Sequence, residues 1–196
     1  MTAKGRGGHA PTGARRRSRR LGGGDPAEPR FCGEGGWNSP PGKASLSPPP
    51  WRTADEEGTR RLGALLAADL APDGVLLLSG PLGAGKTVLA QGVGSGLGID
   101  PAEVLSPTYT LVREHDGPRG RLVHVDLYRL DPEQVLDVGT EELLAGPGVK
   151  VVEWAERLPF AVPGALWLEI EETADGGRKV RPRADAGRVD NRGGGF

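Results

Sequence analysis

The residues with the clearest chemical potential form one short motif. The stretch Gly80-Pro81-Leu82-Gly83-Ala84-Gly85-Lys86-Thr87 fits the pattern G-x-x-x-x-G-K-[ST], whose backbone amides surround the phosphates of a nucleotide. In this pattern the lysine reaches the β- and γ-phosphates, and the hydroxyl residue is a ligand of Mg2+. We therefore expect a nucleotide site with Thr87 as a metal ligand, built from Gly80, Leu82, Gly83, Ala84, Gly85, Lys86 and Thr87.

Two acidic residues could complete this site. Asp126 follows the apolar run over 122–125, and Glu153 follows the apolar run over 149–152. The carboxyl ends of parallel strands meet at the sheet edge where ligands bind, and a phosphate loop needs a carboxylate there to hold Mg2+ or polarise water. Asp126 and Glu153 are therefore both candidates for catalysis and for Mg2+ binding, and their spacing leaves open which one contacts the metal.

Three further residues have more than one interpretation. Thr108 follows Pro107 between the loop helix and Asp126, where nucleotide switches place a threonine that senses the γ-phosphate. Trp154 either packs near the base of the nucleotide or fills the core. His124 alternates with apolar residues, which favours a histidine buried in a sheet over a catalytic one.

The elements that would position these residues alternate between strands and helices. A capping box over 53–56 opens a helix, and the apolar strand over 75–78 leads through the phosphate loop into a second helix that ends near residue 97. Helical residues surround 141–144. Further strands are expected over 108–112, 122–128 and 149–154, and as a hairpin over 165–170 and 178–180. This order predicts an α/β fold, a three-layer P-loop NTPase-type sheet flanked by helices with a C-terminal β-hairpin.

Charge and composition divide the chain into three parts. Residues 1–52 carry ten Lys or Arg against three Asp or Glu with clustered Gly and Pro, so we expect a disordered basic extension. A P-loop ATPase domain is expected over 53–183, followed by a flexible tail over 184–196. Between 53 and 175, nine basic residues oppose 21 acidic ones, which argues against strong nucleic-acid binding by the folded domain.

The basic extension has two interpretations. It could contact nucleic acid or a membrane, but no aromatic residues interleave its arginines, which favours a solvated tail. No apolar run approaches the ~18 residues of a membrane-spanning helix, and no signal-peptide core is present. The single cysteine, Cys32, excludes a disulfide framework and a cysteine-based metal site. We expect a cytoplasmic protein without membrane contact.

Four motifs in this order resemble the TsaE-type family, small bacterial ATPases for threonylcarbamoyladenosine synthesis on tRNA. Besides the phosphate loop, the matching stretches are SPTYTLVRE over 106–114, HVDLYRL over 124–130 and VEW over 152–154. The first helix with Glu56 fits as well. The resemblance covers roughly residues 53–183 and is far more specific than the phosphate loop alone.

The resemblance implies a role that residue chemistry does not supply. Family members bind ATP and Mg2+ and associate with a two-protein complex of the TsaB/TsaD type, which transfers threonylcarbamoyl to the adenosine beside the anticodon. The ATPase therefore meets tRNA only indirectly, and hydrolysis resets the complex. By position, the resemblance implies a catalytic set of Lys86, Thr108, Asp126 and Glu153, with Glu56 and Trp154 near the nucleotide.

One residue departs from the family pattern. Pro81 stands where similar proteins usually have Asp. Proline has no N–H to donate, so any contact made by that acid or its amide is lost, whereas the amides nearer the helix remain. We expect nucleotide binding to persist and activation by a partner to be the affected step.

Three functions remain open at the level of the sequence. A partnered ATPase predicts slow hydrolysis alone, because no arginine finger lies near the loop in the sequence. A kinase for a small metabolite needs an acceptor-binding lid, and only the segment over 139–148 is spare. A nucleotide-gated binding module would bind without useful turnover. No guanine-specific N-K-x-D segment is present, so a preference for ATP over GTP rests on the resemblance.

Overall fold

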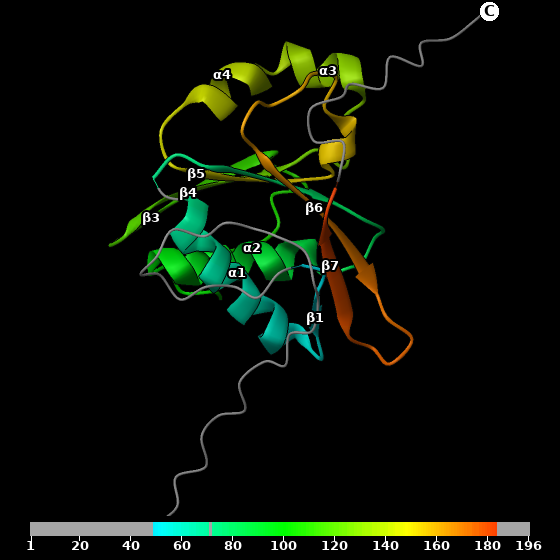
Figure 1. Ribbon diagram of the computed structural model, residues 1–196. Coiled ribbons are helices and arrows are strands. Elements are labelled where there is room, and N and C mark those ends of the chain that lie inside the picture. Colours follow the sequence, from blue (N-terminus) through cyan, green and yellow to red (C-terminus); the bar gives the residue numbers. More distant parts are fainter. Residues whose placement is uncertain (1–48, 71, 184–196) are drawn as a thin grey trace, which may run out of the picture.

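A seven-stranded mixed sheet lies between two helical layers in the computed structural model, which describes residues 49–70 and 72–183 (Figure 1). The strands are β1 (Trp51–Thr53), β2 (Val75–Ser79), β3 (Val112–Gly117), β4 (Gly120–Asp126), β5 (Val149–Glu153), β6 (Leu166–Glu172) and β7 (Arg178–Pro182). Their order across the sheet is β1-β7-β6-β2-β5-β4-β3. The four central strands, β6, β2, β5 and β4, are parallel to one another. The outer strands pair antiparallel, β3 with β4 at one edge and β7 with β6 and β1 at the other. The predicted α/β sheet with its C-terminal hairpin, β6–β7, is confirmed.

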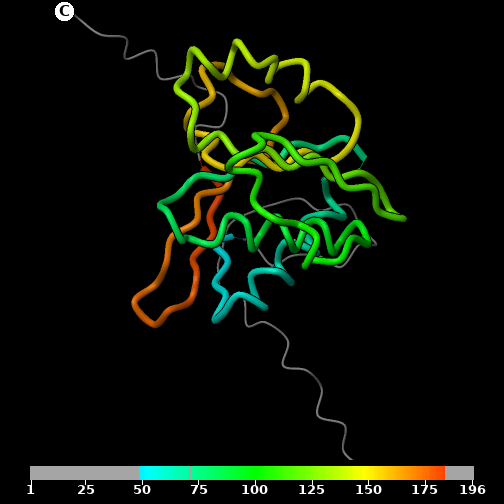
Figure 2. The backbone as a smooth tube through the Cα atoms, turned by 180° about the vertical axis from the view of Figure 1, so that it is seen from behind, coloured from blue at the N-terminus to red at the C-terminus, as the bar shows by residue number. Residues whose placement is uncertain are grey.

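The helices cover the two faces of this sheet in pairs. α1 (Glu56–Leu70) and α2 (Lys86–Leu97) lie on one face, and α3 (Pro132–Asp137) and α4 (Thr140–Ala145) lie on the other, as the views from the front and from behind both show (Figures 1 and 2). A short 3-10 turn, η1 (Ala155–Arg157), follows β5. The chain therefore forms the three layers expected from the alternation of its elements.

The central strand β2 explains why this part of the sequence is apolar without interruption. Leu76 and Leu78 pack into the core under α1 and α2, whereas Leu77 packs into the core under α3 and α4. A parallel strand covered on both faces has no polar side, so its sequence shows a continuous apolar run.

Glycines bring α1 and α2 into close contact. A Cβ atom on Gly92 would lie 2.2 Å from the Arg60 carbonyl oxygen, and one on Gly96 would lie 2.4 Å from Cβ of Ala67. The two helix backbones can therefore approach each other only with glycine at these positions. This packing fixes α2, whose first turn carries Lys86 and Thr87.

The start of α1 differs from the sequence prediction. Thr53 was expected to open a capping box, but it is the last residue of β1. Asp55 caps the helix instead, because its Oδ1 accepts the Gly58 N–H at 2.7 Å. The short strand β1 had no signal of its own, since it is three residues long and stable only beside β7.

The strand expected over 108–112 is also shifted along the chain. The Pro107 carbonyl accepts the N–H groups of Thr110 at 2.9 Å and Leu111 at 2.7 Å, so this segment turns. β3 begins only at Val112 and continues to Gly117. The β-rich composition of the segment was correct evidence for a strand nearby, but the turn set by Pro107 decides where it starts.

Much of the predicted extension over 1–52 and the whole tail over 184–196 lie outside the described residues. Of the extension, residues 49–52 are described, and β1 starts there at the buried Trp51.

Within the described part of the chain, no helix is both long and apolar enough to span a membrane.

Candidate functional site

The phosphate-loop motif lies between β2 and α2, in the expected order of strand, loop and helix. Gly85 is the N-cap of α2 with a φ of 101°, a left-handed conformation that glycine adopts without strain. Gly80, at the start of the loop, has a φ of 140°, and a Cβ atom there would lie 2.2 Å from the Ile170 carbonyl oxygen. The loop therefore ends at the N-terminus of α2, where free amides and the helix dipole favour an anion.

A cavity of about 350 Å³ opens over this loop. Every residue that the sequence predicted for the site lines this cavity, with the exception of Gly80, which lines a neighbouring hollow. Segments that are distant in the sequence thus meet at the carboxyl ends of β2, β4 and β5. The lining consists of Glu56, Leu82, Gly83, Ala84, Gly85, Lys86, Thr87, Val88, Ser106, Thr108, Asp126, Tyr128, Glu153 and Trp154.

Lys86 is folded back onto the start of its own loop. Its amine donates to the carbonyl oxygens of Gly80 at 2.7 Å and Pro81 at 2.9 Å, and it lies 3.8 Å from the centre of the Trp154 ring. Desolvation lowers the pKa of Lys86, and the nearby carboxylates, led by Glu153, oppose that shift. Pro81 therefore acts in the loop through its carbonyl, which also accepts the Ala84 N–H at 3.2 Å.

Glu153 and Thr87 form a direct pair behind the loop. The Thr87 hydroxyl donates to Oε1 of Glu153 at 2.8 Å. The same oxygen lies 2.8 Å from Nε2 of His124, a side chain with no exposed surface. His124, interpreted from the sequence as a sheet histidine, is buried in the sheet as expected, and it also contacts the acidic residue of the site.

Asp126 is held by a different set of partners. Its Oδ2 accepts the hydroxyl of Ser106 at 2.9 Å and that of Thr108 at 2.5 Å, and its Oδ1 accepts the Tyr128 N–H at 2.9 Å. Both oxygens are therefore engaged with the protein itself. The two acids that spacing could not separate are thus distinguished by their neighbours, because Glu153 bonds to the loop threonine and Asp126 anchors the 106–108 segment.

Trp154 contributes to the cavity and to the core at once. Its backbone has a φ of 59°, which is uncommon for a bulky residue. The ring lies over the amine of Lys86 and 4.8 Å from the ring of Tyr128, and it also packs against the core under α3 and α4. Trp154 thus packs against the core, as one interpretation from the sequence expected. Its contact with the base of a nucleotide stays a prediction.

Ser106, Val88 and Tyr128 line the cavity although they were not among the predicted site residues. Ser106 lies two residues before Thr108, and its hydroxyl lies 2.7 Å from that of Thr108. A hydroxyl spaced two residues from a switch-type threonine was a usable signal. Tyr128 leaves β4 two residues after Asp126, at the same edge of the sheet, and its N–H bonds to Asp126.

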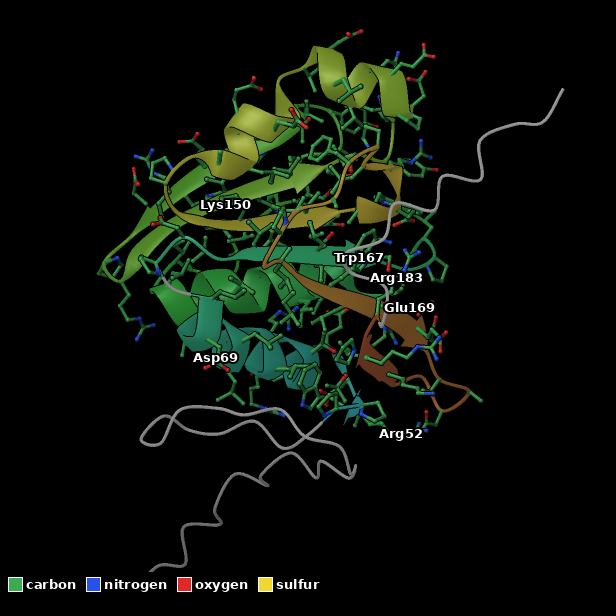
Figure 3. The ribbon with its side chains drawn as sticks, turned by 45° about the horizontal axis from the view of Figure 1, so that its top comes forward. Arg52, Asp69, Lys150, Trp167, Glu169 and Arg183 are labelled. Atoms are coloured by element: carbon green, nitrogen blue, oxygen red, sulfur yellow. The ribbon has the colours of Figure 1, made fainter. Side chains whose placement is uncertain are left out.

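A second cavity of about 670 Å³ lies at the opposite end of the parallel strands. It is lined by α4, the segment over 160–163 and the start of β5, where Lys150 is buried. The Lys150 amine donates to the carbonyl oxygens of Asp73 at 2.7 Å and Gly146 at 2.8 Å. Figure 3 shows Lys150 far from Trp167, Glu169 and Arg183, which gather at the other end of the sheet.

The fold and the loop define a P-loop α/β protein with an acidic residue beside the loop threonine. A family model described as "Threonylcarbamoyl adenosine biosynthesis protein TsaE" matches residues 53–180, so the chain belongs to the TsaE family. The matched residues include the phosphate loop, Asp126, Glu153 and the five strands that follow one another in the chain from β2 to β6.

Named relatives and a solved structure agree with this family. The tRNA threonylcarbamoyladenosine biosynthesis protein TsaE of a Nostoc species is 47% identical over 111 residues, which are 55% of this chain and 68% of the relative. The TsaE protein of Bacillus subtilis is 39% identical over 131 residues, 66% of this chain and 82% of the relative. The crystal structure of YdiB from Bacillus subtilis matches with a TM-score of 0.53 and 36% identity, covering 67% of this chain and 82% of that one.

Proposed function

We propose that this protein is a Mg-ATP-binding ATPase subunit that supports threonylcarbamoylation of the tRNA adenosine next to the anticodon, together with a partner ligase complex of the TsaB/TsaD type. The proposal places it in the cytoplasm and gives it only indirect contact with tRNA. The observation that carries it is the bond between Thr87 and Glu153 beside the phosphate loop, within one cavity. Membership of the TsaE family supports the same role.

The residues around the loop suit Mg2+, which needs few protein ligands, better than a metal ion that is bound entirely by protein side chains. Mg2+ prefers hard oxygen ligands and is usually bound by one or two protein groups together with phosphates and water. The Thr87 hydroxyl and the Glu153 carboxylate supply such oxygens, and Oε1 of that carboxylate accepts the hydroxyl at 2.8 Å. Within residues 49–70 and 72–183, no group of three or more His, Cys, Asp or Glu side chains could hold a metal ion without help. Bound there, Mg2+ would neutralise charge on the phosphates.

The protein groups have separate tasks in this proposal. Lys86 leaves the carbonyl oxygens of Gly80 and Pro81 and contacts the β- and γ-phosphates, a charge-assisted contact that replaces two neutral acceptors. Glu153 orients the metal or the attacking water. Asp126 keeps Thr108 near the γ-phosphate position through their hydrogen bond. Glu56 and Trp154 also line the cavity and complete the nucleotide site.

Exposed apolar side chains near the cavity support a protein partner. Leu82, which lines the cavity, is 77% exposed, and Tyr109, which follows the lining residue Thr108, is 85% exposed. The Tyr109 ring lies 4.0 Å from the guanidinium carbon of Arg129. Aromatic and arginine side chains that are exposed together are typical of interface hot spots. The acidic folded domain favours such a protein contact over direct contact with tRNA phosphates.

The structure gives a metabolite kinase less support. The segment over 139–148, the spare segment in the sequence, contains α4. It lines the larger cavity at the opposite end of the strands rather than the cavity over the loop. A lid that covers the phosphates would have to come from elsewhere in the chain.

The test is hydrolysis of Mg-ATP by the purified chain, with and without the ligase pair. We expect slow turnover alone, near the ~10⁻⁴ s⁻¹ of unassisted switch proteins, and strong stimulation by the pair. Glu153→Ala should mainly lower turnover while nucleotide binding persists, and Glu141→Ala on α4 is the matched control. Intact binding without stimulation would favour a nucleotide-gated binding module, and a phosphorylated product in a metabolite screen would favour a kinase.

A further inference from the structure

His124 is buried between the sheet and α2, next to the acidic residue of the site. It belongs to β4, pairs in register with Val151 of β5, and has no exposed surface. Its Nε2 lies 2.8 Å from Oε1 of Glu153, yet His124 does not line the cavity. It therefore cannot touch a nucleotide and can act on the site only through Glu153.

The direction of this hydrogen bond follows from its two ends. An ionised carboxylate only accepts hydrogen bonds, so Nε2 of His124 must carry the proton and donate. Nδ1 of the same ring is buried and has no hydrogen-bond partner among the described residues. A buried N–H without an acceptor is costly, so the proton belongs on Nε2 and Nδ1 carries a lone pair. His124 thus bonds to Glu153 as a hydrogen-bond donor.

The two oxygens of Glu153 are then used differently. Oε1 accepts from both His124 and Thr87, whereas no hydrogen bond within the described part of the chain ends on Oε2. Two donors on one oxygen fix the rotation of the carboxylate. The other oxygen remains available to a ligand, and Glu153 itself lines the cavity.

We propose that His124 is the positioning residue that fixes the Glu153 carboxylate, so that Oε2 is presented to the Mg2+ or to the water that attacks the nucleotide. This inference rests on the proposed function, because it assigns a task within the same site. Residues that orient a metal ligand from behind typically change metal affinity or activity by about 10- to 100-fold when they are replaced.

The chain offers a matched control on the neighbouring strand. His115 of β3 is partly buried. One of its ring nitrogens, Nε2, has no hydrogen-bond partner among the described residues, as is the case for Nδ1 of His124. It pairs in register with Leu122, two residues before His124, and makes no contact with Glu153 that the structure records. Replacing His115 therefore removes the same type of side chain from the same sheet without touching the carboxylate.

The experiment compares His124→Gln, His124→Leu and His115→Leu in the full chain. Glutamine keeps an N–H donor near the position of Nε2, and leucine removes it. We expect His124→Leu to lower kcat by about 10- to 100-fold and to abolish the gain in ATP affinity that Mg2+ gives, while affinity for metal-free ATP stays within about threefold. His124→Gln should recover most of both losses, and His115→Leu should change neither.

A second measurement keeps the inference testable if His124→Leu fails to fold. Nitrogen-15 NMR of the histidine rings in the wild-type chain should show one ring protonated on Nε2 whose signal disappears in His124→Gln and shifts in Glu153→Gln. A proton on Nδ1, equal losses in the glutamine and leucine variants, or the same loss in His115→Leu would each overturn the proposal.

The experiments distinguish a failure of the proposed ATPase function from a failure of the positioning role of His124. If wild-type protein binds Mg-ATP but does not hydrolyse it with the ligase pair, the ATPase function fails. The affinity and NMR measurements still decide the role of His124 in that case, because neither depends on turnover. If turnover is present and His124→Leu leaves it and the Mg2+ effect unchanged, only the positioning role fails.

Discussion

Two buried lysines lie at opposite ends of the parallel strands, and their contacts are nearly the same. Lys86 and Lys150 are each at most 4% exposed, and each amine donates to two backbone carbonyl oxygens at 2.7 to 2.9 Å. Desolvation lowers the pKa of both. By burial and bonding alone they could not be told apart.

Their surroundings separate them. Lys86 lines a cavity beside Glu153 and lies against Trp154, on a glycine loop that leads into a helix. Lys150 joins the carbonyl oxygens of Asp73 and Gly146, and the Asp73 carboxylate also accepts the Gly148 N–H at 2.8 Å. In the proposed function Lys86 exchanges its carbonyl partners for phosphates, whereas Lys150 links the chain at Asp73 to that at Gly146. A cavity with acidic groups does not by itself separate the two lysines, because Lys150 also lines a cavity together with Asp73 and Glu141. The glycine loop and the Thr87–Glu153 pair beside Lys86 make the difference.

The largest expected effect is on nucleotide binding. Lys86→Ala removes the charge that we propose contacts the β- and γ-phosphates, so we expect the affinity for ATP to fall by at least about 100-fold, or below detection, by isothermal titration calorimetry. Lys150→Met is the matched variant and should keep the affinity within about threefold. Equal losses in the two variants would contradict the division between a functional and a structural lysine.

Stability should show the reverse order. Lys150→Met removes the donor to two partly buried carbonyl oxygens, so the free energy of unfolding in urea should fall by about 1 to 3 kcal/mol. Lys86→Met should cost less, because both of its acceptors belong to its own loop, whereas Lys150 joins β5 to the distant Asp73. A larger loss for Lys86→Met would show that the loop, and not the far end of the sheet, depends on its lysine for stability.

The stability difference should also depend on pH. Burial holds the pKa of Lys150 below its ordinary value of 10.5, so the unfolded chain binds more protons than the folded chain in the window between the folded and the ordinary pKa. The stability of the wild type should therefore rise with pH through that window. Urea unfolding at neutral pH and near pH 10 should show a larger gap between wild type and Lys150→Met at the higher pH. A gap that shrinks would mean that burial does not lower this pKa.

The smallest effect is expected at an exposed cation. Arg121 bonds to Asp116 at 2.7 Å and to Glu114 at 3.1 Å, but these ion pairs lie on the surface of β3 and β4. Exposed ion pairs contribute little, because water and salt screen them. The urea midpoint of Arg121→Met should match that of the wild type within experimental error, at low and at high salt. A clear loss at low salt would show that surface pairs stabilise the edge of this sheet.

The sequence predicted the layers and most of the cavity because those features are encoded locally. The loop pattern, the apolar run before it and the two apolar runs ending in Asp126 and Glu153 each carry their own signal. Parallel strands bring their carboxyl ends to one edge, so the motifs converge without further information. The start of α1 and the position of β3 were wrong, because a cap at Asp55 and a turn at Pro107 overrode composition.

What the sequence determined by itself is the kind of chemistry: a phosphate loop with its lysine and threonine, two acids at strand ends, and membership of one family. Only the tertiary structure decided which partners those groups have. It joined Glu153 to Thr87 and His124, and it committed both oxygens of Asp126 to the 106–108 segment and Tyr128. The reason is that a motif fixes residue types and local backbone, whereas hydrogen bonds between strands depend on register, and register is set by the whole sheet.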